Sequence, residues 1–179
     1  DERNSLVGSE MCIRDSPTPY KLPKNFKEKN LAYAIMRQES VFDYTAISTA
    51  NAMGLMQLVA PTAKAMAKDL GIKCDVKKLT TNPEYNIKLG THYLEYLLER
   101  NNSYIKTAAH YNAGPPADKW DNLNGDPKQM KLYKVIDWIE LIPYYETRNY
   151  VQRIIENMQV YNYVLSGSTK IKVKDYLMR

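Results

Sequence analysis

Apolar residues recur every three or four positions through most of the chain, which is the spacing of amphipathic helices. The pattern predicts six helices, which cover residues 31–40, 61–70, 83–100, 104–113, 126–138 and 146–165. No convincing alternation of apolar and polar residues occurs before Ile171, where a strand would show it. The sequence therefore predicts an all-α domain with minimal sheet.

Residues that favour helix ends support these boundaries. Pro61 stands at a favoured first-turn position, and Asn82 can cap the helix that begins at Pro83. Gly114 and Gly167 follow the fourth and the sixth predicted helices, where glycine commonly ends a helix. The helices are therefore expected to be separated by short breaks.

The pattern divides the chain into four parts. Residues 1–16 have no periodicity and resemble a translated sequencing adapter. We therefore expect them to be extraneous and disordered, and we expect the natural start of the protein to lie upstream. The alternative is that they are a disordered natural terminus. Residues 17–29 are rich in proline and lysine and suit a linker or lead-in. Residues 30–167 form the helical domain, and residues 168–179 are expected to be a frayed tail.

Composition indicates a soluble globular protein with a basic charge. The 179 residues are 44% hydrophobic and 25% charged, and no apolar run approaches the roughly 18 residues that cross a membrane. The formal net charge is +5, and residues 17–179 alone carry 23 basic and 16 acidic residues, a net charge of +7. This balance favours an anionic polymer as partner: nucleic acid, a membrane surface or cell wall. Since Lys and Arg form no stripe, we expect no nucleic-acid partner.

The residue types that most often bind metal are scarce. Cys74 is the only cysteine outside residues 1–16, and a single cysteine forms neither an intramolecular disulfide nor a zinc cluster. His92 and His110 are the only histidines, and no cluster of acidic residues accompanies them. We expect no metal site.

Four separated blocks of residues carry the functional signal. In order, they are Arg37-Gln38-Glu39-Ser40 with Ser48 after it, Gly54-Leu55-Met56-Gln57, Tyr111-Asn112-Ala113-Gly114, and Glu140-Leu141-Ile142-Pro143 with Glu146-Thr147-Arg148. One block alone would be a weak signal. Together, in this order and at these distances, they resemble the catalytic domain of the soluble lytic transglycosylases, lysozyme-like enzymes that cleave the glycan strands of bacterial peptidoglycan. The resemblance covers about residues 30–161.

The resemblance implies a lysozyme-like fold of the goose-type or SLT kind and a specific reaction. The enzymes cleave the β-1,4 bond between MurNAc and GlcNAc and leave 1,6-anhydro-MurNAc ends, without cofactor or metal. One glutamate serves as general acid and then as base, while the N-acetyl group of the substrate assists. Glu39 stands at that position.

Glu39 also has sequence features that suit an acid of this kind. A carboxylic acid must stay protonated near the working pH to protonate a leaving oxygen. Apolar Ile35, Met36 and Phe42 flank Glu39, and the end of its helix adds negative potential, so both effects favour the neutral acid. The alternative is an ordinary glutamate on a helix surface.

The resemblance also assigns substrate-binding residues, which are Ser48, Gln57, Val59, Tyr111, Asn112 and Glu140. Four of them have a structural alternative: a helix cap for Ser48, a surface amide for Gln57 and a core side chain for Tyr111. For Glu140 the alternative is a buried ion pair with Arg148 or Arg37.

Four further positions carry structural expectations. Gly54 would allow a close approach or a conformation that a side chain blocks. Asn51 stands where relatives usually have a small residue, and His110 where they often have alanine, which would modify the edge of a pocket. Arg148 is expected to tie the last helix to the core.

Two other functions remain open. A goose-type-lysozyme-like hydrolase would need a carboxylate that positions water, and Asp43 is the first candidate. A non-catalytic peptidoglycan-binding module would have no need of a buried acid.

The resemblance finally implies a setting for the protein. We expect peptidoglycan glycan strands as partner, a periplasmic location close to the outer membrane or the cell wall, and a monomer. In relatives a helical superhelix precedes this domain.

Overall fold

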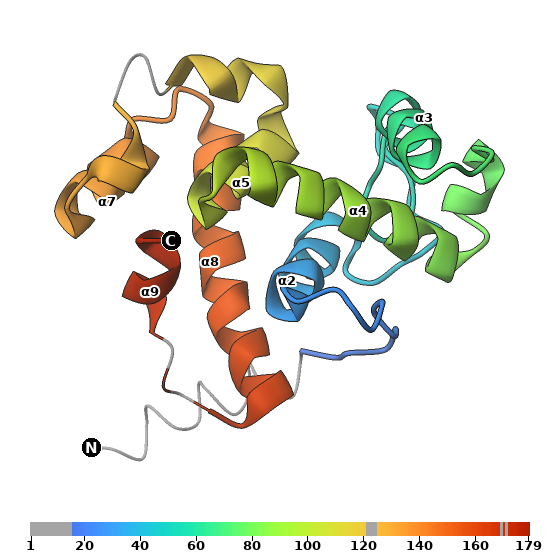
Figure 1. The fold of residues 1–179 in the computed structure, drawn as a ribbon, viewed down its shortest axis with the longest axis horizontal. Coiled ribbons are helices and arrows are strands. Elements are labelled where there is room, and N and C mark those ends of the chain that lie inside the picture. The colour runs from blue at the N-terminus through green and yellow to red at the C-terminus, as the bar shows by residue number, and fades with distance from the viewer. Residues whose placement is uncertain (1–15, 121–124, 169, 171) are drawn as a thin grey trace.

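The fold is built from helices, as the sequence predicts (Figure 1). A computed structural model describes residues 16–120, 125–168, 170 and 172–179. In these residues the only β-type pairings outside helices are isolated bridges that join Met53 to Ile47 and to Leu58. The all-α expectation is therefore confirmed.

Seven α-helices and three 3-10 turns follow one another in the described part of the chain. They are α2 (Lys29–Ser40), α3 (Ala60–Asp69), η1 (Val76–Leu79), α4 (Pro83–Asn101), α5 (Tyr104–Ala113), η2 (Pro115–Lys119), η3 (Pro127–Gln129), α7 (Leu132–Glu140), α8 (Tyr145–Ser166) and α9 (Val173–Leu177). The predicted cap of α4 is present, since the Asn82 side chain accepts a hydrogen bond from the Tyr85 amide. Gly167 ends α8 in the left-handed conformation, as predicted.

The prediction of one helix over residues 126–138 is wrong. The chain forms the short turn η3, passes through Lys131 with an extended ψ of 155°, and only then begins α7. An extended residue cannot continue a helical hydrogen-bond ladder. After this break the apolar stripe of α7, with Val135, Trp138 and Ile139, is buried in the core.

The prediction of a frayed tail is also wrong for its last part. Residues Val173–Leu177 form α9, and Tyr176 is buried against the Tyr104 ring with 5.9 Å between ring centroids. The backbone of Arg179 accepts a hydrogen bond from the Tyr104 amide. These partners are distant in sequence, so the local pattern did not reveal them. The division of the chain into domains stays a prediction.

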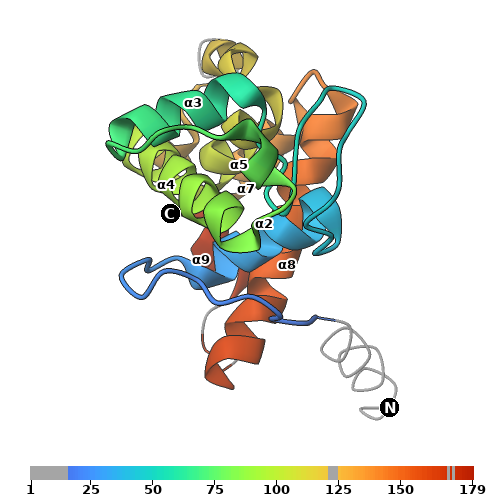
Figure 2. The same cartoon turned by 90° about the vertical axis from the view of Figure 1, so that its right-hand side faces the viewer.

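The centre of the fold is α2, against which α8 packs. In Figures 1 and 2, α8 runs beside α2 and α5, while α3 lies on the far side of α4 from it. Leu31, Ala34 and Ile35 on α2 have no exposed surface. Tyr33 stacks on Tyr161 of α8 with 5.4 Å between ring centroids. Burial on this scale is the main source of stability for a helix.

The loop over residues 45–59 is attached to the helices by a buried asparagine. Asn86 of α4 has no exposed surface, and its Oδ1 accepts a hydrogen bond from the Met56 amide at 2.9 Å. Its Nδ2 donates to the carbonyl oxygens of Met53 and Leu79 at 2.9 and 3.0 Å. One side chain thus satisfies three backbone groups and holds the loop in one shape.

Gly54 lies within this attachment, and the expectation of a close approach is confirmed. Its φ is +73°, and a Cβ atom there would stand 2.0 Å from the Leu79 carbonyl oxygen. Asn51 has a φ of +58°, in the region that glycine adopts without penalty and asparagine tolerates. Asn51 is therefore compatible with the turn at this position.

We predict that Gly54→Ala lowers the free energy of unfolding by about 3 kcal/mol, from a left-handed backbone penalty plus overpacking. Gly71→Ala is the matched control, because Gly71 also has a positive φ (+65°) but no atom lies within 4 Å of its Cβ position. The control should lose only about 1 kcal/mol. Urea denaturation of both variants measures the difference, and equal losses would contradict the role of the close contact.

Candidate active site

Glu39 lies at the end of α2, where the helix stops abruptly. Val41 and Phe42 both have positive φ values, 51° and 65°, which no α-helix can include. Beside Glu39, the buried Ser40 hydroxyl donates to the Leu55 carbonyl oxygen at 2.9 Å and so joins the helix end to the loop over residues 45–59. The half-buried Glu39 carboxyl is thereby held at the junction of the two.

Among the described residues, the Glu39 carboxyl has one hydrogen-bond partner, which comes from α8. The Tyr150 hydroxyl donates a hydrogen bond to Glu39 Oε1 at 2.6 Å, across 111 positions of sequence. The pKa of Glu39 is raised from 4.5 to about 7, chiefly by burial; the hydrogen bond from Tyr150 opposes this shift, and the charge of Glu146 adds to it. Near neutral pH this carboxyl therefore exists in both protonation states and can both give and take a proton.

A polar cavity of about 640 Å³ surrounds the carboxyl. We call it the Glu39 cavity; it is lined by Gln38, Glu39, Asn112, Tyr145, Glu146, Asn149, Tyr150, Gln152, Arg153 and Glu156. Most of these residues come from the first three turns of α8, and the others from the ends of α2 and α5. Three helices thus build the site together.

Asn112 is the predicted binding residue that the structure places with Glu39. Its Oδ1 accepts a hydrogen bond from the Thr147 hydroxyl at 2.6 Å, and its Nδ2 donates to Glu146 Oε1 at 3.3 Å. These bonds tie the end of α5 to the start of α8. Asn112 therefore has a rigid position on the cavity wall.

The side chain of Tyr111 does not line the Glu39 cavity and instead contacts the loop over residues 45–59. Its hydroxyl donates to the Met56 carbonyl oxygen at 2.7 Å, and its ring lies 5.3 Å from that of Tyr93. Burial, followed by the charge of Glu39, raises the pKa of Tyr111 well above its usual value. Tyr111 thus remains a neutral donor close enough to Glu39 to sense its charge.

Ser48 and Gln57 shape the loop over residues 45–59. The Ser48 hydroxyl accepts a hydrogen bond from the Ala52 amide at 3.0 Å. This bond closes a turn, so Ser48 does not act as the helix cap that was its structural alternative. Gln57 is half-buried, and its Nε2 donates to the carbonyl oxygens of Ala46 and Gly54 at 3.2 and 2.9 Å, so it is no simple surface amide. Val59 precedes α3 with 37% of its surface exposed. None of the three lines the Glu39 cavity.

Glu140 likewise lies outside the Glu39 cavity, at the exposed end of α7. It accepts a hydrogen bond from Gln152 Nε2 at 2.7 Å and stands 3.8 Å from Arg148 Nη1. The ion pair with Arg148 is present, but the Glu140 side chain is exposed, so the expected buried pair is wrong; the pair joins α8 to the end of α7. Gln152 lines the cavity and connects Glu140 to it.

Sequence reasoning missed Tyr150 and Glu146 as members of the site. The sequence did place Glu146 and Tyr150 on the same face of a predicted helix, because residues four apart share one face. Both lie in the first two turns of α8. Only the crossing of α8 over α2 shows that this face meets Glu39.

Asp43 is not positioned to act with Glu39. It is exposed and lies outside the Glu39 cavity, and its Oδ1 accepts hydrogen bonds from the amide and the hydroxyl of Thr45 at 2.8 and 2.6 Å. These bonds lower the pKa of Asp43. They are typical of an acid that stabilises a turn.

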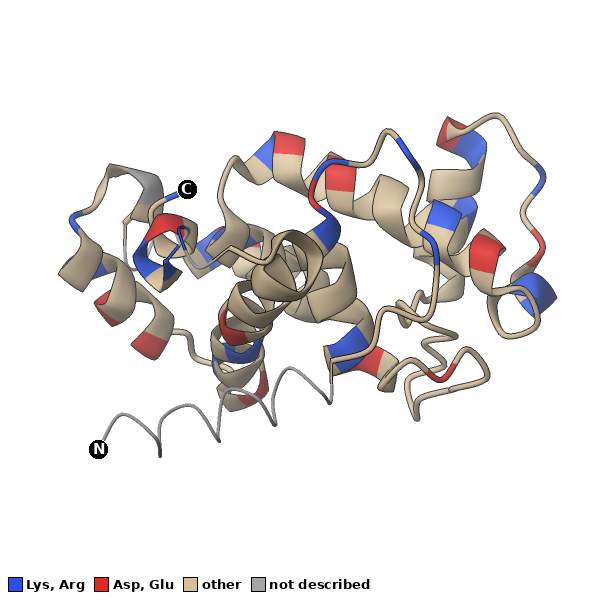
Figure 3. Ribbon diagram, turned by 90° about the horizontal axis from the view of Figure 1, so that it is seen from below, with Lys and Arg blue, Asp and Glu red and all other residues tan. Residues whose placement is uncertain are grey.

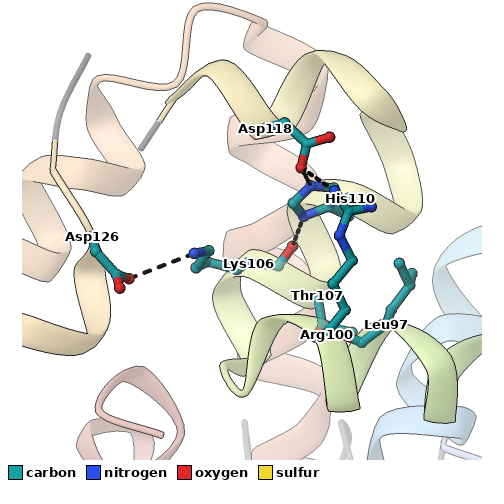
Figure 4. A network of polar contacts seen from close by, with 7 residues as sticks. All are labelled: Leu97, Arg100, Lys106, Thr107, His110, Asp118 and Asp126. Atoms are coloured by element: carbon teal, nitrogen blue, oxygen red, sulfur yellow. Dashed lines mark hydrogen bonds and ion pairs between the residues drawn. The ribbon is translucent and has the colours of Figure 1, made fainter. Parts of the chain in front are cut away.

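His110 belongs to a separate network, shown in Figure 4. Its ring is buried between the Lys106 carbonyl oxygen, 3.0 Å from Nδ1, and Asp118 Oδ1, 2.7 Å from Nε2. Arg100 also donates to Asp118 Oδ1 at 2.6 Å. The expectation that His110 modifies a pocket edge is not confirmed for the Glu39 cavity, because the ring ties α5 to α4 and η2 instead.

Other classes of site have little support in the part of the chain that the structure describes. There, no three His, Cys, Asp or Glu side chains converge as metal ligands. No described helix combines the length and the apolar character needed to span a membrane. Lys, Arg, Asp and Glu are interspersed over several elements in Figure 3 and form no stripe of one sign.

Comparison with known proteins places this geometry in a family. Residues 20–133 match the family described as "Transglycosylase SLT domain". A Haemophilus influenzae protein assigned as a soluble lytic murein transglycosylase is 40% identical over 71% of this chain, and the soluble lytic murein transglycosylase of Escherichia coli K12 is 33% identical over 76%. The chain spans about a fifth of the length of these curated relatives, 21% in each case.

Solved structures agree with the family match. The lytic transglycosylase Slt from Pseudomonas aeruginosa, solved as an inactive Glu→Gln variant, is 33% identical with a TM-score of 0.70 over 84% of this chain and 24% of that one. The 70-kDa soluble lytic transglycosylase of Escherichia coli is 28% identical with a TM-score of 0.71 over 92% of this chain and 26% of that one. The same enzyme has been solved in complex with bulgecin A. The lysozyme-like fold expected from the sequence is thus confirmed.

We predict that Tyr150→Phe raises the pKa of Glu39 further, by about one unit, because the lost hydrogen bond stabilises the charged carboxylate. A carbon-13 NMR titration of the labelled glutamate carboxyl measures this pKa. Tyr145→Phe is the control, since Tyr145 lines the same cavity but its ring contact is with Arg148. An unchanged or lower pKa in Tyr150→Phe would contradict the assignment.

We also predict that Glu39→Gln stabilises the fold at pH 8. The folded chain keeps the Glu39 proton up to about pH 7, whereas an unfolded chain releases it near 4.5, so Glu39 costs stability as the pH rises between these values. The amide removes that cost, a gain of about 3 kcal/mol at pH 8 and almost none at pH 4. Urea denaturation at both pH values measures it. Glu99→Gln, at an exposed position of α4, is the control and should show no such pH dependence. If Glu39→Gln changed the stability equally at both pH values, the prediction would be refuted.

Proposed function

The chain belongs to the transglycosylase SLT domain family, and we propose that it is a peptidoglycan lytic transglycosylase. It cleaves the β-1,4 bond between MurNAc and GlcNAc and leaves 1,6-anhydro-MurNAc ends. The observation that carries the proposal is the half-buried Glu39, which has a pKa of about 7 and lines a polar cavity large enough for sugar rings. The inactive Glu→Gln variant of the Pseudomonas aeruginosa relative supports a glutamate in the central role.

Glu39 acts twice in the proposed reaction. As an acid it gives its proton to the glycosidic oxygen, and the bond from that oxygen to C1 of MurNAc breaks. The N-acetyl group of the same sugar stabilises the cationic C1. As a base Glu39 then takes the proton of the C6 hydroxyl, whose oxygen bonds to C1 and closes the anhydro ring. The proton balance is zero, and no water is consumed.

Tyr150 suits this double role. Its hydroxyl occupies Oε1 of Glu39, so Oε2 is left to carry the proton in transit. A hydrogen bond from a neutral tyrosine stabilises the carboxylate between the two steps without adding charge. Burial raises the pKa of Tyr150 well above its usual value, which keeps this hydroxyl protonated.

The proposed substrate contacts come from two sides. Asn112 offers its amide inside the Glu39 cavity, while Ser48, Gln57, Val59 and Tyr111 form or support the loop side. Glu140 acts through Gln152, which it holds at the cavity wall. Peptidoglycan is the proposed partner and the periplasm the proposed location, near the outer membrane or cell wall, for a monomer.

Hydrolysis of the same bond is the second candidate. Asp43 lies outside the cavity, but Glu146 lines it and raises the pKa of Glu39 through its charge. A hydrolase would use Glu146 to position water. A purely binding module is less favoured, because keeping an acid near neutral pKa by burial costs stability that binding does not need.

We predict that purified peptidoglycan treated with this chain releases muropeptides one water lighter than hydrolytic products and resistant to borohydride reduction. Closure of the anhydro ring removes the reducing end, and mass spectrometry detects both properties. Glu39→Gln should reduce product by at least about a thousandfold while strands still bind. Reducible products of full mass would make the chain a hydrolase and would direct attention to Glu146. Binding of strands without any product from the wild-type chain would favour the binding module.

A further inference from the structure

The buried ring of His110 faces a hydrogen-bond acceptor at each of its two nitrogens (Figure 4). Nδ1 lies 3.0 Å from the Lys106 carbonyl oxygen, and Nε2 lies 2.7 Å from Asp118 Oδ1. A carbonyl oxygen can only accept a hydrogen bond, and an ionised carboxylate likewise has no proton to donate. The His110 side chain is only 5% exposed, so the ring depends on these two partners.

Asp118 is ionised in this arrangement, so the proton between the two side chains belongs to His110. The hydrogen bond from His110 lowers the pKa of Asp118, burial opposes this shift, and the hydrogen bond from Arg100 adds to the lowering. A neutral imidazole carries a proton on one nitrogen only, whereas an imidazolium donates from both. The two contacts of the ring are therefore made together only when His110 is positively charged.

The charged groups around the ring come from three elements. Asp118 on η2 attracts the charged ring, while Arg100 on α4 donates to the same Oδ1 at 2.6 Å and repels it. Lys106 on α5 directs its ammonium towards Asp126, 3.5 Å away, as Figure 4 shows. Among these side chains, histidine is the type that changes its charge around physiological pH. When the ring loses a proton, one of its two hydrogen bonds is lost.

The bond to Asp118 closes a short loop that contains two of the proposed binding residues. The chain reverses at Gly114, which has a φ of +66° and whose amide donates to the His110 carbonyl oxygen at 2.8 Å. The turn η2 then returns to the His110 ring through Asp118. Tyr111 and Asn112 lie inside this loop, in the last turn of α5. Closing the loop restricts the movement of that turn.

Asn112 is the member of this turn that lines the Glu39 cavity. Its hydrogen bonds to Thr147 and Glu146 connect it to α8, but they fix the amide only if the end of α5 stays in place. A group that contacts substrate must be held to within about 0.5 Å by the residues behind it. His110 and Asp118 are in the position to do this for Asn112.

We propose that His110, as an imidazolium, is a positioning residue for the Glu39 site. Its two hydrogen bonds hold η2 against α5 and so fix Asn112 in the wall of the cavity. Loss of the ring proton breaks one of these bonds and lets the end of α5 move. The effect on catalysis rests on the proposed function, whereas the effect on Asn112 does not.

A nitrogen-15 NMR titration of the His and Asn side chains tests the structural part. It is carried out in Glu39→Gln, which removes the titration of the neighbouring acid. We expect the Asn112 amide signals to shift at the pH at which the His110 ring loses a proton. His110→Gln should abolish this shift. His92→Gln should preserve it, because His92 has its own carboxylate partner, Asp69 at 2.6 Å, and joins α4 to α3.

Two outcomes of the titration would overturn the proposal. One is an Asn112 signal that does not change where the His110 ring titrates. The other is a change that survives His110→Gln. If His110→Gln does not fold, as urea denaturation will show, the agreement of the two midpoints in the chain that keeps His110 decides the question.

A kinetic double-mutant cycle tests the catalytic part, at a pH where the titration shows both ring nitrogens protonated. We expect His110→Gln to raise KM for peptidoglycan strands about fivefold with little change in kcat, because one hydrogen bond from Asn112 to substrate is weakened. Asp118→Asn should have the same effect, and the double variant should be no worse than either single variant. His92→Gln should match the wild-type chain.

An unchanged KM in His110→Gln, or additive losses in the double variant, would contradict a positioning role in catalysis. If the wild-type chain cleaves no strand, the proposed function fails, and the NMR titration alone decides whether His110 positions Asn112.

Discussion

The packing of α8 across α2 is the contact on which the rest of the structure depends. It buries the apolar face of α2 and places the first turns of α8 beside the end of that helix. The hydrogen bond from Tyr150 to Glu39 is the polar part of the same contact. Because burial in this interface also desolvates the Glu39 carboxyl, a single packing arrangement stabilises the fold and sets the pKa of the candidate acid.

The loop over residues 45–59 depends on this arrangement in turn. It has almost no regular structure, and polar side chains from the helices replace the missing backbone pairs: Asn86 from α4, Ser40 from α2 and Tyr111 from α5. All three bond to backbone groups between Met53 and Met56. A loop held in this way is rigid, so the side chains it carries keep fixed positions relative to Glu39.

The charges of the site oppose stability and serve the proposed chemistry. Three glutamates line the Glu39 cavity, and the charge of Glu146 is one cause of the raised pKa of Glu39. The negative charge of Glu146 favours a protonated Glu39, while Arg153, one helical turn after Tyr150 on α8, is the cation among the described residues that line this cavity.

The sequence by itself determined most of the helices and made Glu39 the candidate acid. The spacing of apolar residues and the caps at Asn82 and Gly167 located most helices closely, because these signals are local, and the separated blocks made Glu39 and Asn112 candidate site residues. Only the tertiary structure decided which residues meet Glu39. Tyr150 and Glu146 approach it because α8 crosses α2, whereas Glu140 lies outside the cavity and reaches it only through its hydrogen bond with Gln152. Contacts between residues a hundred positions apart follow from packing, which a local pattern does not encode.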